Sequence, residues 1–274
     1  MLAGKSINER QHNGRFIQMK IGIFAYNFNH KKTFEGIMRL WLEEYDISCI
    51  FAQDKLELKF YQSKIRYGPK DLFYIHPQQI AKKLNIPYYV LMHNSEECMN
   101  LIKTKELDLG IVLGARILKK YIIDAFKIGI LNMHPAVLPW NRGLDNLKWA
   151  IVDKLPQAVT THLIDQEIDW GSIIREEIIE VYPDDTLLDI HLRLQSKELD
   201  LMIKSIKMLE KGFSAIHTKF EGRYHKAIPQ EIEVNLFQLF EEYKKNYDSI
   251  KLKYKILEKT KNFNEWYSKN WINK

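Results

Sequence analysis

"DLGIVLGARILKKYIIDAFKIGILNMHP", from Asp108 to Pro135, is the stretch of this sequence that decides the fold. It begins with an apolar run, continues through a segment with helical spacing of apolar residues (116–126), and returns to a second apolar run, "GILNM". Short runs that are apolar throughout are typical of strands in a parallel sheet that is covered on both faces. The stretch therefore predicts a strand, a helix and a parallel strand in succession.

The same alternation extends to both sides of this unit. Further strand-like and helical segments are expected at 19–26 (strand), 27–45 (helix), 47–52 (strand), 77–85 (helix), 87–91 (strand), 95–107 (helix), 158–165 (strand), 172–181 (strand) and 186–211 (helix). We therefore predict an α/β fold: a Rossmann-like, mostly parallel sheet with helices on both faces, followed by a small, mainly helical C-terminal region.

The chain is expected to divide into three parts. Residues 1–18 form an N-terminal extension, 19–211 the main domain, and 212–274 a C-terminal helical region rich in aromatic residues and Lys. The extension lacks the apolar core of a signal peptide, and no apolar run approaches the ~20 residues that span a bilayer. Cys49 and Cys98 lack metal-binding or CxxC spacing. Both are interpreted as reduced packing residues of a cytoplasmic protein without a membrane partner.

The positive charge of the chain is concentrated near its end. Residues 204–274 hold 14 Lys and one Arg against nine acidic residues, which accounts for the whole net charge of +6. A basic tail can bind nucleic acid, but acidic and aromatic residues dilute this one. We interpret it as a solvated helical face and do not expect a nucleic-acid partner. One face of 235–247 collects Leu236, Leu239, Phe240 and Tyr243. That face either caps the main domain or forms a homodimer contact.

Polar residues stand where the decisive stretch ends. Asn132 and His134 are two residues apart in an extended run, so their side chains point the same way, and Pro135 ends the strand directly after them. Ligands of open α/β sheets bind outside the carboxyl ends of the strands. A carboxylate, Asp169, can reach the same place from the turn "QEIDWG". Amide, imidazole and carboxylate together suit acyl transfer, although a lone His is most often a surface or satisfied core residue.

Other kinds of site lack their signatures. There is no GxGxxG or GxxxxGK[ST] after a strand, and no GxSxG. His134, His162 and Asp169 have no recognised metal-ligand spacing, so no metal is expected.

Two linked motifs carry a resemblance to a known family. "NMHPAVLPWNRG" (132–143) and "AVTTHLIDQEIDWGSII" (158–174) resemble the formyltransferases that use 10-formyltetrahydrofolate, over roughly residues 19–211. The resemblance implies that Asn132, His134 and Asp169 are catalytic and that His162 supports them. Ala136, Val137 and Ala158 depart from the family pattern, which puts the shape of the loop after His134 in doubt. None of these three departures touches the catalytic trio.

The resemblance also implies where the two substrates bind. "GARIL" (114–118) is similar to the loop whose backbone edge holds the pterin, with Arg116, Ile117 and Leu118 at the matching places, and Asp165 begins the turn on the other side of the pocket. Contacts with the acceptor are expected from Trp140, Asn141, Arg142 and Tyr224. For Trp140 and Tyr224 the alternative is packing, and for Arg142 it is a surface charge.

The acceptor is expected to be the amine of a nucleotide-linked amino sugar, in glycan biosynthesis. The first strand-to-helix loop, "YNFNHKKT", has no Gly, whereas members that formylate glycinamide ribonucleotide carry a Gly-rich phosphate loop there. Members that act on methionyl-tRNA carry a C-terminal β-barrel, but this tail has helical periodicity. Formylation of glycinamide ribonucleotide or methionyl-tRNA stays open as an alternative, as does a non-catalytic folate-binding protein.

Overall fold

The structure is a computed structural model. It describes residues 11–12, 15–16, 19–56, 65, 74–167, 169, 171–213, 216–217 and 222–260.

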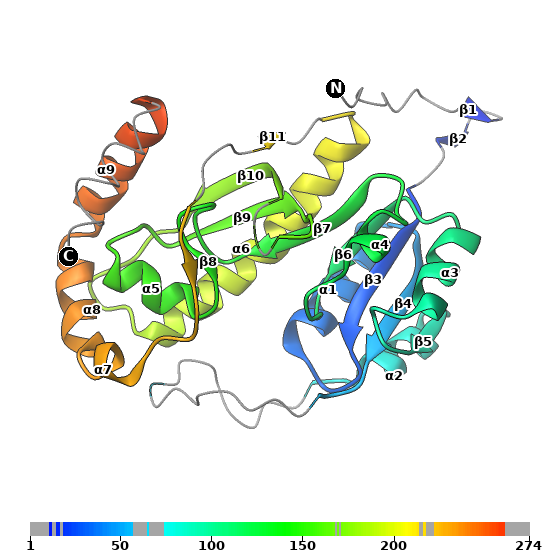
Figure 1. The fold of residues 1–274 in the computed structure, drawn as a ribbon, viewed down its shortest axis with the longest axis horizontal. Coiled ribbons are helices and arrows are strands. Elements are labelled where there is room, and N and C mark those ends of the chain that lie inside the picture. Colours follow the sequence, from blue (N-terminus) through cyan, green and yellow to red (C-terminus); the bar gives the residue numbers. More distant parts are fainter. Residues whose placement is uncertain are drawn as a thin grey trace.

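Within these residues the centre of the fold is a sheet of eight strands, in the order β11-β10-β9-β7-β6-β3-β4-β5 (Figure 1). The strands are β3 (Ile21–Tyr26), β4 (Ile47–Gln53), β5 (Tyr88–Val90), β6 (Leu109–Val112), β7 (Gly129–His134), β9 (Ala158–Leu163), β10 (Ser172–Ile178) and β11 (Ile216–His217). Strands β7, β6, β3, β4 and β5 are parallel, while β9, β10 and β11 are added antiparallel. The predicted mostly parallel sheet is confirmed.

Helices cover both faces of this sheet, as predicted. Ile23 of β3 packs in one hydrophobic cluster with residues of α1 (Lys31–Leu42), α2 (Pro77–Lys83) and α6 (Leu187–Glu210). Its neighbour Phe24 points the other way, into a second cluster with α3 (Glu96–Thr104) and α4 (Lys120–Ile123). The central strands are therefore apolar on both sides because both sides are covered.

Side chains cap the starts of two helices. Ser95 caps α3 by accepting the N–H of Cys98, and Thr186 with Asp189 forms a reciprocal capping box on α6. The predicted helix over 116–126 is wrong in extent, since α4 begins only at Lys120. Its first residues form an extended loop, whose Ile117 carbonyl and Lys119 N–H are hydrogen-bonded to a side chain outside the loop.

The C-terminal helices share the main hydrophobic cluster with the sheet. α5 (Asn146–Val152) packs against α8 (Leu236–Lys245), next to α7 (Gln230–Glu233) and α9 (Tyr247–Thr260), at one end of the molecule (Figure 1). The apolar residues Leu236, Phe240 and Tyr243 belong to the cluster that contains Ile23. The apolar face of α8 therefore packs against the main domain, although the proposed boundary near residue 212 stays a prediction.

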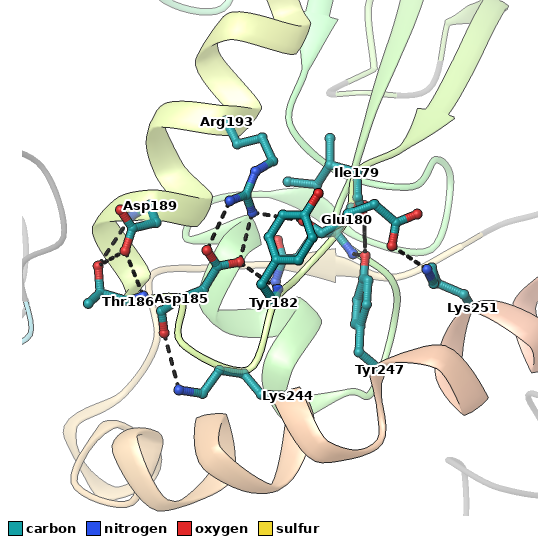
Figure 2. A network of polar contacts seen from close by, with 11 residues as sticks. Ile179, Glu180, Tyr182, Asp185, Thr186, Asp189, Arg193, Lys244, Tyr247 and Lys251 are labelled. Atoms are coloured by element: carbon teal, nitrogen blue, oxygen red, sulfur yellow. Dashed lines mark hydrogen bonds and ion pairs between the residues drawn. The ribbon is translucent and has the colours of Figure 1, made fainter.

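Polar contacts at this junction reinforce the packing (Figure 2). Arg193 of α6 makes a bidentate ion pair with Asp185, at 2.8 and 2.9 Å. The main-chain oxygen of Asp185 accepts a hydrogen bond from Lys244 of α8, and the hydroxyl of Tyr247 donates to the carbonyl of Ile179 at 2.7 Å. Bonds from α8 and α9 thus converge on the segment that joins β10 to α6.

Two further strand pairs lie outside the main sheet. β1 (Gln11–His12) pairs antiparallel with β2 (Arg15–Phe16), inside the segment expected to be an extension. β8 (Arg142–Gly143) pairs parallel with β12 (Tyr224–His225). The second pair brings residues far apart in the sequence to one place beside the end of β7.

The structure also describes the two cysteines and the apolar character of the helices. Cys49 and Cys98 are buried and free, and burial raises the pKa of both thiols to about 12. None of the helices in the described part of the chain has the length and apolar character that crossing a bilayer requires.

Candidate active site

Asn132 and His134 lie at the carboxyl end of β7, where the strand stops before Pro135. Pairing with β9 sets Asn132 opposite His162 and His134 opposite Thr160. Because residues two apart share one side of a strand, both side chains point to the same side of the sheet. The strand therefore presents an amide and an imidazole together.

The ring of His134 is held by a main-chain carbonyl. Its Nε2 lies 2.8 Å from the oxygen of Asn141, and the ring is 95% removed from solvent (side-chain exposure 5%). A carbonyl only accepts, so Nε2 carries the hydrogen of this bond. Nδ1 is then the nitrogen directed at Asp169, whose Oδ1 lies 3.4 Å away. The contact between Nδ1 and Oδ1 is attractive only when one of these two atoms carries a proton. The pair can therefore take up one proton.

Asp169 is positioned by a left-handed backbone conformation. It has a φ of +51°, in the left-handed region, within the turn between β9 and β10. Its Oδ2 accepts the N–H of Gly143 at 2.9 Å. Gly143 has a φ of +93°, and a Cβ there would lie 2.1 Å from the oxygen of His225. Only Gly allows β8 and β12 to approach this closely and leave the N–H directed at the carboxylate.

His162 fixes the orientation of the Asn132 amide. The Asn132 Nδ2 and His162 Nε2 atoms are 3.1 Å apart. Burial lowers the pKa of His162 to about 4. The charge of Asp169 raises this pKa and His134 lowers it further, but both effects are smaller than that of burial. The ring is therefore neutral near pH 7 and its Nε2 accepts from the amide. One of the two N–H groups of Asn132 is used in this bond, which leaves the other for a bound molecule.

These groups can perform one kind of chemistry together. An amide N–H and an imidazole can stabilise negative charge on an oxygen, and an adjacent carboxylate can take up a proton. Among the described residues, no group of three or more His, Cys, Asp or Glu is placed to hold a metal ion.

The residues expected to hold the cofactor lie on two segments near this site. Arg116 and Ile117 are exposed, and Leu118 is buried, in the loop that follows β6, the strand next to β7. Asp165 lies just after β9, where its Oδ1 accepts the N–H of Glu167. The loop after β6 lies at the carboxyl end of β7, because the two strands are parallel, whereas β9 is antiparallel and its end pairs with Leu131.

The residues expected to contact the acceptor differ in their surroundings. Trp140 is buried in a cluster that contains Val137 and Tyr254, which indicates packing. Asn141 is fully buried, and its side chain donates to the carbonyl of Asn146. A substrate contact by either residue stays a prediction.

Arg142 and Tyr224 lie in register with each other, because β8 and β12 pair there. Tyr224 is 45% exposed. These two residues are one position away from Gly143, the residue that holds Asp169. Of the four expected acceptor residues, they are the ones whose placement suits contact with a bound molecule.

The loop after His134 is supported by residues that the sequence did not single out. Thr160 donates to the carbonyl of Ala136 at 2.6 Å, and Glu176 accepts the N–H of Leu138 at 3.2 Å. These bonds fix the loop although Ala136 lacks the hydroxyl of the family's Ser. A Thr and a Glu within strands carry no sequence signal for such a role.

Comparisons with known proteins show a similarity to one family. Residues 73–206 match the family described as Formyl transferase. A curated methionyl-tRNA formyltransferase of Fusobacterium nucleatum is 30% identical over 173 residues, which is 62% of this chain and 53% of that protein. One from Clostridium botulinum is 28% identical over 200 residues, covering 71% and 62%. This chain thus spans about half the length of the first of these relatives.

Solved structures with the same fold include two kinds of formyltransferase. A sugar N-formyltransferase from a Shewanella species has a TM-score of 0.56 and 18% identity, covering 81% of this chain and 87% of that one. A phosphoribosylglycinamide formyltransferase from Streptococcus pneumoniae has a TM-score of 0.54 and 21% identity, covering 70% and 99%. At these identities the likeness concerns the fold. Residues 73–206 thus match the formyl transferase family, and the chain shares the fold of these formyltransferases.

Proposed function

We propose that this protein transfers a formyl group from 10-formyltetrahydrofolate to the amine of a nucleotide-linked amino sugar. The observation that carries the proposal is the placement of Asn132, His134 and Asp169 at the carboxyl end of β7. The folate donor is supported by the match of residues 73–206 to the formyl transferase family.

The reaction begins when the neutral amine of the acceptor attacks the formyl carbon. The carbonyl electrons move to the oxygen, which is stabilised by the N–H of Asn132 that His162 leaves unused and by the positive charge that His134 gains when the His134–Asp169 pair takes up the amine proton. Loss of one such donor typically lowers kcat by about 10²–10³-fold. The attacking nitrogen gives up one proton to the His134–Asp169 pair. The pair returns a proton to N10 of the folate as the C–N10 bond breaks, so the atoms balance.

The donor is expected to bind between two segments beside the catalytic trio. The loop with Arg116, Ile117 and Leu118 would supply main-chain groups to the pterin ring. Asp165, at the start of the turn that carries Asp169, would close the opposite side.

Two observations support an amino sugar as the acceptor. At the end of β3, Tyr26 and Phe28 stack with their ring centroids 4.9 Å apart, where glycinamide ribonucleotide enzymes have a Gly-rich phosphate loop. Tyr224 and Arg142 lie together beside Asp169. An exposed aromatic ring next to a guanidinium suits a nucleobase and its phosphates.

A second candidate acceptor is methionyl-tRNA, because the curated relatives described above are methionyl-tRNA formyltransferases. This chain matches about half of the first relative's length, and α7, α8 and α9 make up most of its described C-terminal region. A tRNA acceptor would make binding steeply dependent on salt, because phosphate contacts release counterions. An amino-sugar enzyme would be indifferent to tRNA.

One experiment tests the proposal against its alternatives. The protein is incubated with 10-formyltetrahydrofolate and, separately, nucleotide-linked amino sugars, glycinamide ribonucleotide and methionyl-tRNA, and products are analysed by mass spectrometry. We expect one formyl group to replace an amine hydrogen on an amino sugar. A product on the ribonucleotide or the tRNA would overturn the choice of acceptor. No product from any of them, with folate bound, would support the non-catalytic alternative.

A further inference from the structure

The loop after β6 receives little support from apolar packing. Ile117 is 62% exposed, and Arg116 and Lys119 on either side of it are also exposed, whereas Leu118 is buried. Side-chain burial therefore holds the loop at Leu118. A loop of this kind keeps one shape only where its main chain is hydrogen-bonded to something rigid.

Asn94 supplies those hydrogen bonds. Its Nδ2 donates to the carbonyl of Ile117 at 2.8 Å, and its Oδ1 accepts the N–H of Lys119, also at 2.8 Å. One amide thus satisfies an acceptor and a donor two residues apart, as a neighbouring strand would. The two bonds flank Leu118. The hydroxyl of Tyr121 donates in turn to the main-chain oxygen of Asn94.

Asn94 is itself held firmly on both sides. The N–H of His93 donates to Oε1 of Gln53 at 2.8 Å, and the buried His93 ring donates from Nε2 to the carbonyl of Phe51 at 3.0 Å. Ser95, on the other side, caps α3. The Asn94 amide is therefore anchored to β4 and to α3 before it contacts the loop.

The other end of the loop has a separate attachment. The hydroxyl of Tyr26, at the end of β3, donates to the carbonyl of Ala115 at 3.0 Å. Arg116 and Ile117 thus lie between the Tyr26 bond and the Asn94 bonds. This is the part of the chain that would present its main chain to a pterin ring.

We infer that Asn94 is a positioning residue for the folate donor: it sets the main chain of residues 116–119 in the shape that binds the pterin. This inference rests on the proposed function, because that function assigns the loop to the folate. Asn94 acts through Ile117 and Lys119. Its loss should weaken folate binding and leave the acceptor and the proton-transferring groups unaffected.

The test compares Asn94→Ala with a matched control, Asn246→Ala. The Asn246 amide donates to the carbonyl of Glu242 at the exposed end of α8, away from this loop. Binding of 5-formyltetrahydrofolate, which does not transfer its formyl group, is measured by calorimetry. Two lost hydrogen bonds should raise the Kd for Asn94→Ala by roughly tenfold. The KM for the acceptor and the Tm should match those of Asn246→Ala.

Asn94→Asp separates the two bonds. Its carboxylate still accepts from Lys119 but can no longer donate to Ile117, and it places negative charge beside that carbonyl. Folate binding should therefore be as weak as in Asn94→Ala. Tyr121→Phe, which removes only the bond to the Asn94 main chain, should weaken binding less.

Hydrogen exchange in the protein without folate makes the inference testable independently of the proposed function. Amide exchange at residues 116–119 should accelerate in Asn94→Ala and not in Asn246→Ala. Unchanged exchange would overturn the inference, as would unchanged folate affinity or an equal loss of affinity for acceptor and folate. Failure of the wild-type protein to bind folate would instead overturn the proposed donor, even if exchange responds as expected.

Discussion

The contact between His134 Nδ1 and Asp169 Oδ1 is the residue-scale feature on which the proposed reaction depends most. His134→Ala removes the ring, and Asp169→Asn removes the negative charge while keeping the side-chain shape. Either change should lower kcat by about 10²–10⁴-fold, the usual contribution of a positioned acid or base. Steady-state kinetics with unchanged circular dichroism would check this.

Glu167→Gln is the matched control for Asp169→Asn. Glu167 is an exposed carboxylate in the same turn, so its neutralisation should leave kcat unchanged. Near wild-type turnover by Asp169→Asn would show that the carboxylate is not the proton acceptor.

His162 predicts a dependence of stability on pH. Burial lowers its pKa in the folded protein to about 4, whereas in the unfolded chain it stays near the ordinary value of 6.5. Between these values the unfolded state binds more protons, so the free energy of unfolding falls as pH drops from 6.5 towards 4. Urea unfolding across this range should show a shallower fall for His162→Gln than for the wild type.

His30 is a second buried histidine whose effect on stability can be compared with that of His162. Burial, followed by Lys32, lowers its pKa to about 4 as well. His30→Gln should therefore flatten the same pH range, and the two substitutions together should flatten it further. A slope unchanged by His162→Gln would mean that the ring is not held neutral in the folded state.

The sequence predicted the trio at residue scale but not what holds it in place. The period of two along a strand places Asn132 and His134 on one side, and Pro135 marks the strand end. The carbonyl of Asn141 that fixes His134 is a main-chain group, which every residue possesses, so no residue type indicates it. The hydrogen bond from the Gly143 N–H to Asp169 could not be predicted either. A lone Gly indicates an unusual backbone conformation but not which residue its N–H binds.

At the scale of elements, a buried ion pair joins α5 to α7. Lys148 Nζ and Glu233 Oε1 are 2.5 Å apart, with side-chain exposures of 1% and 2%. Replacing one partner leaves the other charged and buried, which typically costs about 3–5 kcal/mol. Lys148→Met should therefore lower the free energy of unfolding by that amount, as measured by urea denaturation.

The double variant Lys148→Met with Glu233→Leu is the informative control. It removes both charges and keeps apolar volume, so it should regain most of the lost stability. A double variant as unstable as Lys148→Met would show that contacts other than this pair hold α5 and α7 together.

Elements with a strong periodic pattern were predictable, and elements defined by long-range contacts were not. The apolar runs identify β3, β4, β6 and β7, and the helical segments predicted at 95–107 and 186–211 begin at Ser95 and Thr186, the residues that cap α3 and α6. The start of α4 was placed too early, because residues 116–119 have helical propensity but are held extended by Asn94. Strands β8 and β12 have two residues each, too few to show any pattern before they pair.

At the scale of the whole molecule, the described C-terminal helices are joined to the sheet through buried tyrosines. The hydroxyl of Tyr243 donates to the carbonyl of Leu155 at 2.7 Å. The hydroxyl of Tyr247 accepts the N–H of Gln157 and donates to the carbonyl of Ile179 (Figure 2). Both rings also belong to the main hydrophobic cluster. We therefore expect the helices and the sheet to unfold in one cooperative transition.

Tyr247→Phe tests this cooperativity. It keeps the ring but leaves the Ile179 carbonyl and the Gln157 N–H without this partner, at a typical cost of about 1–3 kcal/mol. If the molecule unfolds as one unit, hydrogen exchange in α8 and in β6 should accelerate by the same factor. Tyr182→Phe is the control, since that ring is 51% exposed and its stacking with Arg193 needs no hydroxyl. Faster exchange in α8 with unchanged exchange in β6 would show that the C-terminal helices open independently of the sheet.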